Sequence, residues 1–190
     1  MRFSLKLAAR FGLAAALCAC LFPAAYASQN GAAKPAVFPH LTSYNLNKAK
    51  LNLPGDFAGQ LNLLLISFRP EQKKQIDSWM PVAEALQHID SNFRWYQMPV
   101  SGSENFIFRW WDNSSMRSDD TDPETWPWIV PVYVDKNRFR HSLQIPTDRQ
   151  ISVLLVDKQG RVLWRSQGPM TPENRDSLKA KVAEAAADRH

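Results

Sequence analysis

The sequence holds one nearly continuous apolar run, Leu61-Asn-Leu-Leu-Leu-Ile-Ser-Phe68. A short run of this kind predicts a strand that is covered on both faces, as in the middle of an α/β sheet. Arg69-Pro-Glu71 ends the run, and apolar residues then recur every three or four positions as far as about residue 90. This spacing predicts an amphipathic helix over residues 71–90, which we expect Pro81 to kink or divide.

Towards the C-terminus, the sequence predicts a β-hairpin followed by a helix. Lys158-Gln-Gly-Arg161 is a turn signal that offers Gly160 for a position of positive φ. Thr171 suits the N-cap and Pro172 the first position of a last helix, which should run to about Ala187 with Leu178 and Val182 facing inward. The other predicted elements are strands over 93–100, 129–134, 151–157 and 162–166, and a short helix over 137–143.

The N-terminal segment predicts export to the periplasm. Three basic residues precede an apolar run over 11–22, and Ala25-Tyr-Ala27 then places small residues at the two positions that a signal peptidase reads. We therefore interpret residues 1–27 as a signal peptide, 28–43 as a flexible tether and 44–187 as the folded domain. Three alternatives stay open for the leader: a mitochondrial presequence, a lipid anchor at Cys20, and an uncleaved signal anchor, for which the apolar run is short.

Charge and cysteine content argue against two classes of function. Lys and Arg number 23 against 18 Asp and Glu, but three of the basic residues lie in the leader and the others are scattered, so no basic patch indicates nucleic-acid binding. The two cysteines, Cys18 and Cys20, also lie in the leader. We therefore expect a processed chain that forms no disulfide and performs no thiol redox catalysis.

Three stretches resemble a known family. They are Leu63–Gln72 with the helix up to Trp79, the loop Ser114-Ser-Met-Arg-Ser118, and the hairpin Val153–Trp164 with Gly168 and Thr171-Pro-Glu173. They are similar to the mitochondrial ATP-synthase assembly factor family often labelled ATP-ten, which has a thioredoxin-like fold. The resemblance implies an α/β thioredoxin-like three-layer sandwich with a mixed central sheet and an irregular insertion over about 101–128. It also implies a non-enzymatic role in assembly, although an exported chain would lie on the opposite side of the membrane from the mitochondrial members.

Six residues are the candidates for binding: Arg69, Trp110, Trp111, Met116, Arg117 and Pro146. Arg69 follows the first core strand, where redox thioredoxins hold their thiolate pair, so it is either part of a plain turn or a repurposed binding edge. The tryptophans, with Trp126 and Trp128, either anchor a partner or pack the insertion onto the sheet. The Met-Arg pair is a polar loop or a partner contact. Pro146 resembles the cis-proline beside thioredoxin active sites, although we expect its own peptide bond to be trans.

We expect no metal or cofactor. The four histidines lack helical pair spacing, the acidic residues between 119 and 124 lack the register of a calcium loop, and no motif provides a base for Ser114 or Ser115. The sequence therefore favours a non-catalytic binding or assembly factor at the cell envelope, with a protein partner in or near the membrane. The alternative is a thiol-independent enzyme, or a protein that handles a metal or heme, on the same scaffold.

Overall fold

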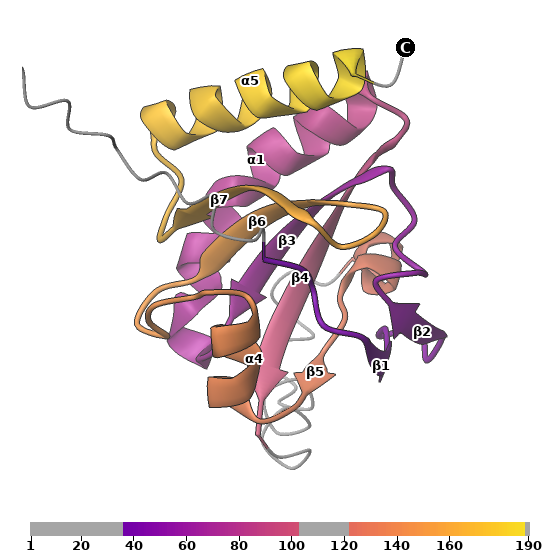
Figure 1. Ribbon diagram of the computed structural model, residues 1–190, viewed down its shortest axis with the longest axis vertical. Coiled ribbons are helices and arrows are strands. Elements are labelled where there is room, and N and C mark those ends of the chain that lie inside the picture. Colours follow the sequence, from indigo (N-terminus) through magenta and orange to yellow (C-terminus); the bar gives the residue numbers. More distant parts are fainter. Residues whose placement is uncertain (1–35, 103–121, 189–190) are drawn as a thin grey trace, which may run out of the picture. The chain divides into compact units, whose positions relative to one another are not determined.

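The computed structural model describes residues 36–102 and 122–188. Its elements are β1 Leu41–Tyr44, β2 Lys50–Leu53, β3 Leu61–Ser67, η1 Pro70–Gln72, α1 Lys73–Ile89, β4 Phe93–Ser101, η2 Pro123–Trp128, β5 Val132–Tyr133, α4 Lys136–Ser142, β6 Ser152–Asp157, β7 Val162–Gln167 and α5 Pro172–Ala187. Five strands form one sheet in the order β5-β4-β3-β6-β7 (Figure 1). The sheet is mixed, because β4 is parallel to β3 and β5 whereas β6 is antiparallel to β3 and β7.

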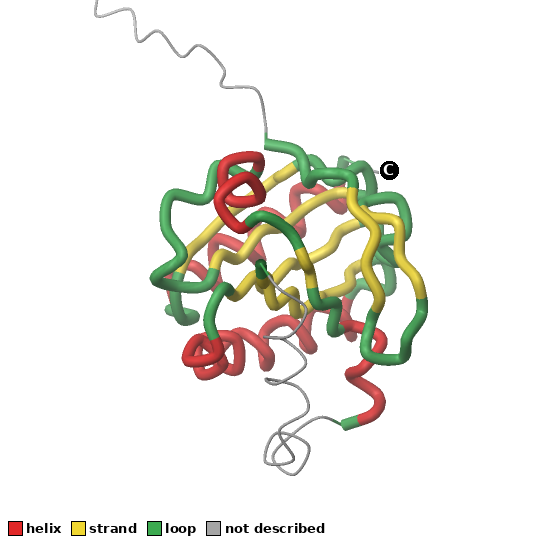
Figure 2. The backbone as a smooth tube through the Cα atoms, turned by 90° about the horizontal axis from the view of Figure 1, so that it is seen from below, coloured by secondary structure: helices red, strands yellow, loops and turns green. Residues whose placement is uncertain are grey.

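The middle strand, β3, divides the core into two halves. All of its residues are buried, as its apolar sequence predicts. Leu63 and Leu65 pack with side chains of α1 and α5 on one face, while Leu64 and Ile66 pack with side chains of α4 and of the β1–β2 region on the other. Figure 2 shows the helices on both sides of the strands, so the sheet is the middle of three layers.

The helix after β3 is not divided at Pro81, which was one of the two predicted effects of this proline. The residues before Lys73 form the short 3-10 helix η1, and α1 then continues through Pro81 without division. Pro81 is exposed and lies in the middle of the helix, while the apolar face of α1 buries Trp79, Val82 and Ala83 on either side of it. The packing of this face against the sheet therefore holds the helix together across the hydrogen bond that proline removes.

The structure confirms the predicted C-terminal hairpin and helix. Gly160 has a φ of 80° in the turn between β6 and β7, and a Cβ there would come within 2.9 Å of Pro54, so both conformation and space require glycine. Thr171 caps α5 through a capping box with Asn174, and Pro172 is the first residue of the helix. Leu178 and Val182 are the buried residues of α5.

The predicted tether over 28–43 is wrong in its second part, because the folded domain begins before residue 44. Phe38 is fully buried in the core, and β1 already spans Leu41–Tyr44. The main chain also joins the hairpin: the amide of Phe38 donates to the oxygen of Gly160 at 2.8 Å, and the amide of Val162 donates to the oxygen of Ala36 at 2.9 Å. Residues 36–38 therefore form an isolated antiparallel bridge, Val37 to Arg161, at the start of β7.

The predicted insertion is described only at its end. Residues 103–121, which contain four of the six binding candidates, lie outside the described residues. At the end of the insertion, η2 places the ring of Trp128 5.8 Å from that of Tyr96 and 6.4 Å from that of Trp95. Trp128 therefore packs the end of the insertion onto β4. In the part of the chain that the structure describes, no helix is long and apolar enough to cross a membrane.

Candidate functional site

Gln72 joins the turn after β3 to the loop between α4 and β6. Its side chain is buried, and its Oε1 accepts a hydrogen bond from the amide of Phe68 at 2.8 Å. Its Nε2 donates to the main-chain oxygen of Asp148 at 2.8 Å. Lys136 of α4 adds a third link, since its Nζ donates to the oxygen of Phe68 at 3.0 Å. Two loops that are far apart in the sequence are thereby fixed to one another.

We call the turn over residues 68–72 and the loop over residues 143–151 the Arg69 junction. Arg69 lies on its surface. Its guanidinium contacts the Asp148 carboxylate at 3.3 Å, and its side chain remains 54% exposed. Partial burial tends to raise the pKa of Asp148, but the hydrogen bond and charge of Arg69, with a smaller contribution from Arg140, outweigh it and hold that pKa below its ordinary value. Asp148 is therefore ionised at neutral pH, and it forms an ion pair with Arg69 at the exposed edge of the junction.

Replacing Arg69 with glutamine should raise the pKa of Asp148 towards the ordinary value of 3.8. Because the native pKa is the lowered one, the ion pair stabilises the fold fully above the unfolded pKa, and this stabilisation disappears as the pH falls through the folded pKa. The pair is partly exposed, so we expect a loss of less than about 1 kcal/mol at pH 7. NMR titration of the Asp148 carboxyl checks the direction; an unchanged pKa in the variant would contradict the assignment.

Pro146 lies in the same loop as Asp148, two residues before it, and is exposed. Its peptide bond is trans, as expected, since Leu53–Pro54 is the only cis bond among the described residues. Its main-chain oxygen accepts a hydrogen bond from Nη2 of Arg140 at 2.7 Å. The structure thus brings the predicted residues Arg69 and Pro146 to one pair of loops, whereas Trp110, Trp111, Met116 and Arg117 lie outside the described residues.

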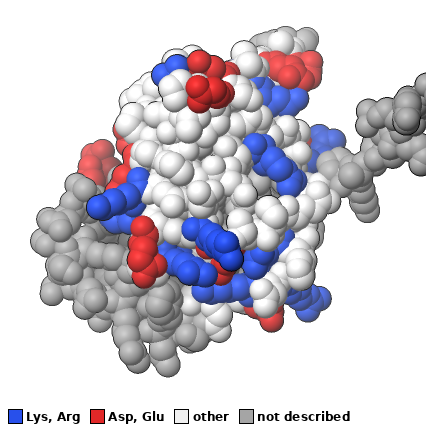
Figure 3. Space-filling view, turned by 90° about the vertical axis from the view of Figure 1, so that its left-hand side faces the viewer, with Lys and Arg blue, Asp and Glu red and all other residues white. Residues whose placement is uncertain are grey.

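The surface around this junction is basic. Figure 3 shows several Lys and Arg side chains close together on one face of the molecule, with Asp or Glu side chains beside them. Along the chain, α4 and this loop contain Lys136, Arg138, Arg140 and Arg149, against the acidic residues Asp135 and Asp148. Asp135 caps α4 by accepting a hydrogen bond from the amide of Arg138, and Asp148 is paired with Arg69. The exposed charge available to a ligand here is therefore positive.

Two residues of the junction were not predicted from the sequence. Gln72 follows a proline at a helix start and looks like an ordinary first-turn residue, while Asp148 lies 76 positions from it. No local sequence signal marks Gln72 as buried; the structure shows that it is, and a buried amide needs partners for both its donor and its acceptor. Its partner, the main chain of Asp148, can be identified only from the structure, because the fold brings the two loops together.

Comparison with solved structures decides the fold. The chain resembles an uncharacterised thioredoxin-like protein of Porphyromonas gingivalis, with a TM-score of 0.54, 16% identity, and coverage of 82% of this chain and 95% of that one. It also resembles the exposed lipoprotein thioredoxin of Streptococcus pneumoniae, with a TM-score of 0.53, 12% identity, and coverage of 77% and 99%. The fold is thioredoxin-like.

A third thioredoxin-like neighbour is a putative thiol:disulfide interchange protein, DsbE, of Chlorobium tepidum, with a TM-score of 0.52, 13% identity, and coverage of 80% of this chain and 97% of that one. No family model matches the sequence, and no curated protein matches it. The comparisons therefore show the thioredoxin-like fold alone. They do not confirm the narrower resemblance to the ATP-synthase assembly factors, which stays a prediction.

Proposed function

We propose that the protein is an exported thioredoxin-like protein that binds a protein partner at the cell envelope and performs no thiol chemistry. The observation that carries this proposal is the composition of the turn between β3 and α1. In thiol-active thioredoxins, a cysteine pair lies at this helix start, which lowers the pKa of a thiol. Here the turn is Arg69-Pro-Glu-Gln72, and its buried side chain, that of Gln72, is engaged in holding two loops together.

Thiol–disulfide exchange needs a thiolate, because the thiolate is the attacking group. The chain has cysteine only at positions 18 and 20, in the segment that we interpret as a signal peptide. Residues 28–190 contain none. Several solved neighbours are named as thiol:disulfide interchange proteins, so the scaffold supports that chemistry elsewhere, but this chain lacks the reacting group at the corresponding place.

The same junction is suited to binding. Its exposed side chains, Arg69 among them, lie on loops that are fixed by the hydrogen bonds of Gln72 and Lys136, so little conformational freedom would be lost when a partner binds. Its net positive charge favours an acidic segment of a protein. Export is supported by the leader and by a neighbour that is named an exposed lipoprotein. A role in assembling a membrane complex is the narrower form of this proposal and depends on the family resemblance.

Thiol content tests the absence of redox chemistry. The protein, expressed with its own N-terminus and purified in the form that the cell exports, should match the mass of residues 28–190 and show no titratable thiol after denaturation. It should also leave the disulfides of insulin unreduced, while a thiol-active thioredoxin assayed alongside reduces them. Retained thiols together with insulin reduction would overturn the proposal, and a lipid adduct at Cys20 would replace the periplasmic form with an anchored one.

A further inference from the structure

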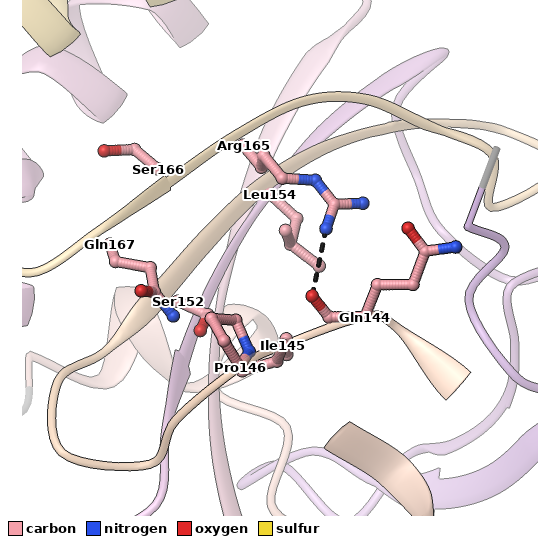
Figure 4. A pocket seen from close by; sticks show the side chains of 8 residues that line it. All are labelled: Gln144, Ile145, Pro146, Ser152, Leu154, Arg165, Ser166 and Gln167. Atoms are coloured by element: carbon pink, nitrogen blue, oxygen red, sulfur yellow. Dashed lines mark hydrogen bonds between the residues drawn. The ribbon is translucent and has the colours of Figure 1, made fainter. Parts of the chain in front are cut away.

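The sheet face that carries α4 has a pocket beside β7. Its volume is about 410 Å³, and its walls come from residues 144–146 of the loop after α4 and from the facing strands β6 and β7 (Figure 4). Pockets that bind small molecules typically measure about 300–1,000 Å³, so this one has room for a small ligand. It adjoins the Arg69 junction and shares residues 144–146 with it.

Two polar side chains in this pocket lack partners. The Oγ of Ser152 and the Nε2 of Gln167 are buried and form no hydrogen bond with any described residue. They lie opposite one another on β6 and β7, so both face the same side of the sheet, and Ser152 is only 1% exposed. Most buried polar groups in proteins are paired, since an unpaired one costs free energy. The Nε2 of Gln167 only donates and the hydroxyl of Ser152 can donate, so a ligand with acceptor atoms satisfies both groups.

Positive charge borders the pocket. Arg165 extends from β7, and its Nη1 donates to the main-chain oxygen of Gln144 at 3.2 Å (Figure 4). Arg140 donates to the oxygen of Pro146 on the other side of the loop. Among the described residues neither guanidinium forms a salt bridge, although the charge of Arg140 acts on Asp148, and no acidic side chain lines the pocket. The site is therefore suited to an anion.

The remaining lining is apolar. Leu154 and Ile145 are buried side chains of the pocket wall, and the ring of Pro146 lies at its exposed edge. An inorganic anion would leave this surface without a contact, whereas a hydrocarbon body would cover it. A ligand that uses the whole pocket thus combines a charged acceptor group with an apolar body.

We propose that this pocket binds a small aliphatic carboxylate. Its carboxylate accepts hydrogen bonds from Ser152 and Gln167, its chain lies along Leu154, Ile145 and Pro146, and the positive charge of Arg165 at the border of the pocket favours the anion. The proposal goes beyond partner binding at the Arg69 junction and does not depend on it, because the polar groups that hold the ligand, those of Ser152 and Gln167, are not part of that junction. Either can fail alone.

Decanoate is the probe, with decanol and acetate as matched comparisons. Decanol keeps the hydrocarbon and removes the charge, and acetate keeps the charge and removes the hydrocarbon. In calorimetric titration of the exported protein, we expect saturable binding of one decanoate per chain with a Kd on the order of 100 µM, and at least about tenfold weaker binding of the other two. Absence of saturable decanoate binding, or equally strong binding of decanol, would overturn the proposal.

Two variants separate ligand recognition from folding. Ser152→Ala removes an unpaired hydroxyl, so the Tm of the ligand-free protein should stay unchanged or rise, whereas decanoate affinity should fall about tenfold. Arg165→Gln should weaken decanoate by a similar factor and leave decanol binding unchanged. Lys179→Gln, on the exposed surface of α5, removes the same charge away from the pocket and serves as the control. If both pocket variants bind decanoate as tightly as the control does, the pocket is not the site.

Discussion

Replacing Phe38 with alanine is expected to lower the free energy of unfolding by about 3–5 kcal/mol. The ring is fully buried and packs edge to face against Phe57 at 5.4 Å and Phe139 at 5.8 Å, so its removal leaves a cavity between the N-terminal segment and α4. Domains of this size are stable by only about 5–15 kcal/mol, so a loss of this size would bring the protein close to unfolding at ordinary temperature.

Val37→Ala is the matched control for Phe38→Ala. Val37 is the neighbouring residue and is 40% exposed, so we expect its replacement to cost less than about 1 kcal/mol. Urea denaturation followed by circular dichroism compares the two variants with the wild type. Equal stability of Phe38→Ala and the wild type would mean that residues 36–43 are a tether after all.

Replacing Trp79 with alanine should cost at least as much, about 3–5 kcal/mol. Trp79 is fully buried at the centre of α1 and contacts the ring of Trp164 at a centroid distance of 6.1 Å. Its Nε1 also donates to the main-chain oxygen of Gly168 at 3.0 Å, which fixes α1 to the connection between β7 and α5. The variant therefore loses apolar burial and leaves a carbonyl group unpaired in the core.

The two components of the Trp79 effect can be separated. Trp79→Phe keeps most of the apolar volume and removes the hydrogen bond, so we expect an intermediate loss in free energy of unfolding. Trp164→Ala removes the half-buried ring on the other side of the contact and should cost less than Trp79→Ala. If Trp164→Ala proves the more damaging in thermal denaturation, α1 is not fixed to the sheet as the structure indicates.

The regular part of the fold is predictable because its signals are local. The apolar run of β3, the glycine in the β6–β7 turn and the Thr171 cap each act over a few residues, and each appears in the structure where its signal lies. No local sequence signal marks residues 36–38 as part of the folded domain. Val37 and Phe38 are two apolar residues between prolines and small residues, and only the distant hairpin gives them a partner.

The candidate site could be predicted only in part, because only some of its features depend on local sequence signals. Arg69 and Pro146 could be placed from the order of strands and helices, since both follow elements that the sequence marks clearly. The contact between the two loops could not be predicted from the sequence, because the side-chain amide of Gln72 bonds the main chain of Asp148 across 76 positions. The unpaired donors in the pocket depend on the register of β6 against β7, which a sequence pattern does not specify.

Site-specific photocrosslinking at position 69 asks whether this thioredoxin-like domain binds a protein at the Arg69 junction. A photoreactive residue in place of Arg69, in the full chain expressed in its own host, should give one discrete protein adduct in the envelope fraction. The same residue in place of Lys179, on the exposed surface of α5, should give none. Identical adducts at both positions, or no adduct at position 69 from a folded and exported protein, would contradict the claim.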